Sequence, residues 1–188
     1  MRVDDAEDSV YHGLKALPWR PSYLTAMWIL CGELRSLYSD SISEDDRPVM
    51  ALTMDLVREV VIYDEPPESI GRARTLVDDW DRVRAAGEAG ASGGLLDVWL
   101  TFDALAQEIA GLSARYYATE WVTNAATERW RTSDRSGPIV VDPDEETDDS
   151  SPMAQTLELF GRVVSRVTAM QGPEWDPVRI RTEIFGQP

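Results

Sequence analysis

Carboxylates are the side chains of this sequence whose number and spacing could do chemistry, and they are densest between residues 142 and 149. A calcium-binding loop of the EF-hand type needs glycine at its sixth position and glutamate at its twelfth. A loop starting at Asp142 has Thr147 and Met153 there, so this pattern is absent. The segment therefore indicates a solvated acidic linker or a surface for a basic partner. Its six acids are Asp142, Asp144, Glu145, Glu146, Asp148 and Asp149.

A second group of acids could hold a divalent cation. Asp55 and Glu59 lie one turn apart in a predicted helix, and Asp78 lies in the next predicted helix. Carboxylate oxygens are the ligands that Mg²⁺ prefers. These residues define the alternative function, an all-helical Mg-dependent nucleotide hydrolase. Such enzymes carry two Glu-x-x-Glu/Asp pairs on neighbouring helices, whereas the single Glu-x-x-Glu here, Glu65 to Glu68, encloses two prolines. A structural ion pair with Arg58, which lies beside these acids, is the simpler interpretation.

Other catalytic groups are scarce. The chain has one histidine, His12, and one cysteine, Cys31, which excludes zinc sites of the Cys/His type. No serine lies in a G-x-S-x-G motif, and no glycine-rich phosphate loop is present. The sequence therefore favours a protein that is not an enzyme and needs no cofactor.

The charge balance narrows the class of partner. The 188 residues include 34 acids and 18 bases, for a net charge of −16. Nucleic acids and anionic membranes are disfavoured, because both are bound by clustered Lys and Arg. A basic protein partner is favoured. Lys15 is the single lysine, a bias typical of GC-rich bacterial genes, and the lack of a signal peptide or membrane-spanning stretch predicts a cytoplasmic protein.

Helical periodicity predicts one all-α domain over residues 1–188, a mostly antiparallel bundle of about five main helices. The expected helices cover residues 21–40, 45–64, 68–87, 95–131 and 150–172, with a shorter helix over 176–186. The fourth would be about 55 Å long, so we expect a break at Gly111 or within 119–124. Residues 1–10 and the loop 142–150, before the last long helix, are expected to be flexible acidic segments, and 137–143 to be extended.

If the five helices alternate in direction, three acidic groups meet at one end of the bundle. They are residues 4–8, then Asp64, Glu65 and Glu68, then the six acids of 142–149, in all thirteen carboxylates. This arrangement requires that the fourth helix does not reverse at its break. Trp19 and Trp130, near helix ends, could anchor a partner there, and Tyr117 with Trp121 could extend the surface.

These patterns predict an acidic binding protein that neutralises or regulates a basic partner, in the manner of an immunity protein or antitoxin. A homodimerisation module is the second alternative, because the first two predicted helices are apolar over most of their surface.

Overall fold

The computed structural model describes residues 3–18, 20–63, 67–88, 93–133, 152–173 and 175–186. Within these ranges every regular element is helical, which confirms the all-α prediction. There are eight α-helices there instead of about five. They are α1 (Val3–Ala16), α2 (Arg20–Tyr38), α3 (Arg47–Tyr63), α4 (Pro67–Glu88), α5 (Gly93–Ile109), α6 (Arg115–Ser133), α7 (Pro152–Ala169) and α8 (Pro177–Phe185), with a 3₁₀ turn over Ser39–Ser41.

Helix α2 lies at the centre of the bundle. Residues 22–31 are all buried, and α2 packs against α3, α5, α6 and α7. A helix that is apolar all round must be covered on every side, and here the same chain covers it. Of the two apolar helices that motivated the homodimer hypothesis, α2 is therefore covered within one chain, whereas α3 keeps Leu52, Ile62 and Tyr63 exposed.

Helix α1 is an element that the sequence analysis missed. The segment 1–10, expected to be flexible, contains the first two turns of this helix. Its inner face is formed by Ala6, Val10 and Leu14, which are buried against α6 and α7. At Gly13 a Cβ atom would lie 2.9 Å from Cγ1 of Val164, so glycine allows α1 to approach α7 closely.

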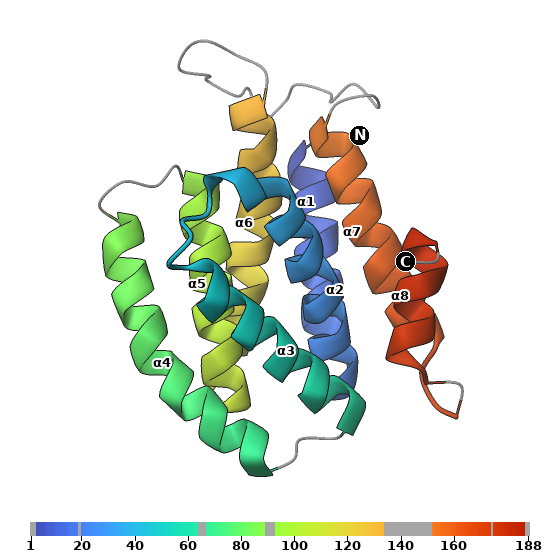
Figure 1. Cartoon of the computed structure of the whole chain (residues 1–188). Coiled ribbons are helices and arrows are strands. Elements are labelled where there is room, and N and C mark those ends of the chain that lie inside the picture. The colour runs from blue at the N-terminus through green and yellow to red at the C-terminus, as the bar shows by residue number, and fades with distance from the viewer. Residues whose placement is uncertain are drawn as a thin grey trace.

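The predicted fourth helix is a hairpin of two helices. Helix α5 ends at Ile109, and the chain turns through Gly111 (φ 82°) and Ser113 (φ 58°) before α6 begins. Of the two expected places for the break, Gly111 is confirmed, whereas 119–124 lies inside α6 and was wrong. Glycine adopts positive φ without the steric cost that a Cβ atom brings. Helices α5 and α6 then run side by side in opposite directions (Figure 1).

The reversal of the chain between α5 and α6 determines which helix ends lie at the same end of the bundle. The beginning of α1, the end of α6 and the beginning of α7 lie at one end of the bundle, and the beginning of α4 lies at the opposite end (Figure 1). Consecutive helices alternate in direction as expected. Five main helices and one shorter helix were predicted, and the two additional helices change which connections lie at the same end of the bundle.

The short helix predicted over 176–186 is present as α8. Asp176 caps it, since its Oδ1 accepts hydrogen bonds from the main-chain N–H groups of Val178 (3.0 Å) and Arg179 (3.1 Å). Pro177 occupies the first turn and Gly186 follows the last residue. The predicted extended segment 137–143 lies outside the described residues.

Among the helices that the structure describes, none combines the length and the apolar composition that crossing a bilayer requires.

Candidate functional site

Most acids of the predicted binding surface cannot be placed. Asp64, Glu65, Trp19 and the six acids of 142–149 lie outside the described residues, and Trp130 belongs to the end of α6. Glu68 is exposed in the first turn of α4. This turn and the acids of α1 lie at opposite ends of the bundle (Figure 1). The expected meeting of all thirteen acids at one end is therefore wrong for the acids that the structure describes.

The residues of the alternative metal site do not form one. Glu59 is engaged by α4, because its carboxylate accepts hydrogen bonds from the Arg72 guanidinium and from the Ser69 hydroxyl (3.3 Å). Asp55 and Asp78 are exposed. Over the described ranges, no three side chains of the His, Cys, Asp or Glu type are grouped as a metal ion would require. Glu59 does form a structural ion pair, but its base is Arg72 of α4 and not the predicted Arg58.

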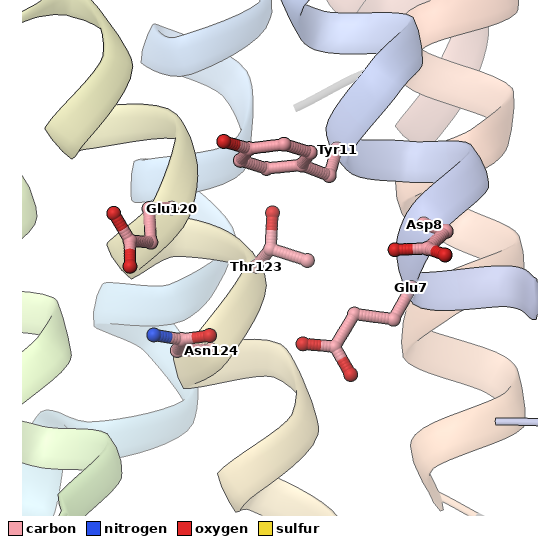
Figure 2. A pocket seen from close by; sticks show the side chains of 6 residues that line it. All are labelled: Glu7, Asp8, Tyr11, Glu120, Thr123 and Asn124. Carbon is pink, nitrogen blue, oxygen red and sulfur yellow. The ribbon is translucent and has the colours of Figure 1, made fainter. Parts of the chain in front are cut away.

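An acidic hollow of about 480 Å³ lies between α1 and α6. Spacings of three and four residues put side chains on one face of a helix, and both walls follow this rule. Figure 2 shows Tyr11 and Glu7 reaching from α1 toward α6, with Thr123 and Asn124 opposite them. The lining residues are Glu7, Asp8 and Tyr11 from α1 and Glu120, Thr123 and Asn124 from α6. We call this the α1–α6 groove.

Exposed tyrosine rings lie on α6 about one turn before the groove residue Glu120. Tyr116 is 60% exposed and Tyr117 is 58% exposed, both in the first turn of α6. The rings of Tyr117 and Trp121 are stacked, with centroids 5.5 Å apart and an interplanar angle of 24°. Leu112, also exposed, precedes them in the turn after α5. Together these three aromatic rings and one leucine give the beginning of α6 a partly apolar surface. The sequence-based expectation that Tyr117 and Trp121 lie together is confirmed.

A half-buried arginine fixes the two walls to each other. The guanidinium of Arg115 donates hydrogen bonds to the main-chain carbonyls of Lys15 (3.2 Å) and Leu17 (2.9 Å) at the end of α1. It also lies 4.8 Å from the ring centroid of Tyr23 in α2. The two helices that form the walls of the groove are therefore held together at one end.

Hydroxyl groups inside the groove are already used by the backbone. The Thr123 hydroxyl donates to the carbonyl of Thr119 at 2.8 Å, and Thr127 repeats this contact one turn later with Thr123. A hydroxyl becomes a nucleophile when a neighbouring base takes its proton, whereas these protons are directed at main-chain carbonyls. The groove thus offers carboxylates, an amide and the ring of Tyr11, a set suited to binding cations.

Sequence analysis found only part of this site. Glu7 and Asp8 were noted as acids, whereas Tyr11, Glu120, Thr123 and Asn124 were not singled out. A usable signal existed: Ala6, Val10, Leu14 and Leu17 recur at helical spacing. That pattern defines α1 and would have placed Glu7 and Tyr11 together on its other side.

No family model matches the chain, and neither a curated protein nor a solved structure gives a match.

Proposed function

We propose that this chain is a non-enzymatic binding protein that holds a basic segment of a partner protein in the α1–α6 groove. The observation that supports the proposal is the composition of this groove, where three carboxylates, Glu7, Asp8 and Glu120, line a hollow together with the ring of Tyr11. Exposed Tyr116 and Tyr117 lie about one turn away on α6.

Each component has a physical role in such binding. Carboxylates form charge-assisted hydrogen bonds with guanidinium and ammonium groups, which are about twice as strong as neutral ones. Exposed Tyr and Trp supply apolar area with little loss of conformational entropy, and they are frequent energetic anchors of interfaces. The net charge of −16 would speed the encounter with a basic protein and repel nucleic acids.

An inhibitor or regulator of a basic protein, such as an immunity protein or antitoxin acting in the bacterial cytoplasm, is the concrete form of this proposal. It is supported by the acidity of the chain and by a groove whose two walls are held together at one end. The proposed contact surface differs from the one expected from sequence, since it uses α1 and α6 and not the turn at Glu68.

Calorimetry with an arginine-rich peptide tests the proposal. A peptide of the same length with citrulline in place of arginine keeps the shape and removes the charge. We expect the arginine peptide to bind and the citrulline peptide not to bind. The affinity for the arginine peptide should fall steeply between low salt and about 0.15 M salt. Affinity that is independent of salt, or equal for both peptides, would contradict the proposal.

A pair of matched variants locates the binding surface. Glu7→Gln with Glu120→Gln removes two charges from the groove, and Asp78→Asn with Glu158→Gln removes two exposed charges from α4 and α7. We expect the groove variant to weaken binding about tenfold and the control variant to weaken it much less. Equal losses would show that only net charge matters.

A further inference from the structure

The single lysine of the chain lies in a cation site made of two tyrosines. Nζ of Lys15, in α1, is 4.2 Å from the ring centroid of Tyr11 and 4.9 Å from that of Tyr116 in α6. It also donates a hydrogen bond to Oη of Tyr11. Both ring distances are within the range of about 6 Å over which a cation is attracted by the negative face of an aromatic ring.

This cation site is continuous with the groove. Tyr11 contributes its ring to the cation site and also lines the groove beside Glu7 and Glu120 (Figure 2). Tyr116 is largely exposed, so the site is reached from solvent. A cation bound between the two rings would therefore lie at the edge of a carboxylate-lined hollow.

We propose that Tyr11 and Tyr116 form a guanidinium-binding subsite, which Lys15 fills in the unbound protein and vacates for an arginine side chain. This inference rests on the proposed function, because it identifies where an arginine of the partner's basic segment would bind. Lys15 acts as a competitor from within the chain.

The chemistry favours arginine over lysine as the incoming group. A guanidinium is planar, stacks on aromatic rings and is less strongly hydrated than an ammonium. Its five N–H donors can face the rings and still reach a carboxylate such as Glu7 or Glu120. Lys15 has a flexible stem of four methylenes, so its ammonium can move into water when the rings are taken. When an arginine side chain replaces Lys15, the rings of Tyr11 and Tyr116 hold one cation before the exchange and another after it.

Removal of Lys15 should therefore open the subsite. We would titrate arginine amide into the wild type and into Lys15→Ala, following the tyrosine ring signals by NMR. Citrulline amide, which has the same α-amino group and lacks the guanidinium charge, is the comparison probe. Arg74→Ala, which removes one exposed positive charge from α4, is the matched control. We expect Lys15→Ala to bind arginine amide about threefold to fivefold more tightly than Arg74→Ala. Equal affinities would overturn the inference.

A double-mutant cycle separates the subsite from a general charge effect. Tyr116→Leu removes the ring and keeps an apolar side chain at an exposed position. We expect this change to abolish the gain caused by Lys15→Ala. A gain that persists without the Tyr116 ring would mean that Lys15 acts only through its charge, and the inference would fail.

The two proposals can fail separately. If the arginine peptide does not bind the wild type and arginine amide still binds Lys15→Ala through Tyr116, the proposed function fails while the guanidinium subsite is supported. If the peptide binds through Glu7 and Glu120 and the Lys15 and Tyr116 variants show no coupling, the subsite fails while the proposed function is supported.

Discussion

The hydroxyl of Tyr23 donates a hydrogen bond of 2.6 Å to the main-chain carbonyl of Arg115, whose guanidinium lies 4.8 Å from the centroid of the same ring. Tyr23 is buried in α2, and Arg115 is the first residue of α6. Burial raises the pKa of the Tyr23 phenol far above its usual value, so the hydroxyl keeps its proton. Since Arg115 also holds the end of α1, this pair joins three helices beside the groove.

Tyr23→Phe should lower the free energy of unfolding by about 1–2 kcal/mol, because it deletes the hydrogen bond to the Arg115 carbonyl and the one accepted from the Thr119 hydroxyl (3.3 Å) and changes little volume. Urea unfolding measures the loss. Tyr117→Phe makes the same chemical change at an exposed ring and should have almost no effect. Equal effects of the two variants would show that the bond between Tyr23 and Arg115 is not stabilising.

The order and type of most helices could be predicted from the sequence, because apolar residues recur with helical spacing and caps mark the ends. Helix α8 illustrates this: it was predicted over 176–186, where Asp176 caps it, Pro177 opens it and Gly186 follows its last residue. Helix α1 was not predicted because its buried positions Ala6 and Val10 are small, and the residues around them are mostly charged or polar. The many acids of residues 1–10 indicated a flexible segment, whereas the helical spacing of its apolar residues indicated the helix that is present.

The site was harder to predict because it depends on which helices become neighbours. One turn at Gly111 reverses the chain and brings α6 alongside α5 and α1. Glu120 and Glu7, distant in sequence, meet only as a result of that reversal. Sequence spacing determines which residues share a helix face, but it does not determine which faces meet across the bundle.

Thr53→Val should be strongly destabilising for its size. The indole N–H of Trp80 donates a 2.7 Å hydrogen bond to Oγ1 of Thr53, and both side chains are buried between α3 and α4. Valine has the same shape and no acceptor, so the indole N–H would lose its partner at a cost of about 1–3 kcal/mol.

Thr75→Val is the control for that change. The Thr75 hydroxyl is exposed on α4 and donates to the carbonyl of Gly71 at 3.3 Å. Its replacement should change the free energy of unfolding by less than about 0.5 kcal/mol. Thermal unfolding followed by circular dichroism compares the two variants, and a control as unstable as Thr53→Val would refute the role of the Trp80 bond.

Asp103 should make stability depend on pH. This residue of α5 is 1% exposed, and burial raises the pKa of its carboxyl above the ordinary value of 3.8. A hydrogen bond from Gln107 (2.8 Å) and the charge of Arg84 lower the pKa only in part, and Asp81 adds to the rise. The folded state therefore binds the proton more tightly than the unfolded state. This contribution to stability is full below pH 3.8 and is lost as the pH rises through the folded-state pKa.

Asp103→Asn removes that dependence and keeps an acceptor for Gln107. The variant should be more stable than the wild type at about pH 7, and the difference should shrink to nothing as the pH falls below 3.8. Urea unfolding at a series of pH values measures it. Asp78→Asn removes one charge from an exposed position of α4 and controls for net charge. A difference that stays constant with pH would contradict the assignment to Asp103.

Two glycines should respond to alanine with opposite signs. Gly111 has a φ of 82°, and the position that a Cβ atom would take there has no neighbour within 4 Å, so Gly111→Ala is opposed only by the backbone conformation. We expect a loss of about 1–2 kcal/mol. Gly71 is exposed inside α4, also with open space around it, and Gly71→Ala should gain about 0.5–1 kcal/mol because alanine restricts the unfolded chain. Chemical denaturation of both variants gives the two signs. A neutral Gly111→Ala would mean that the turn between α5 and α6 can relax, and the position of α6 beside α1 would then need another cause.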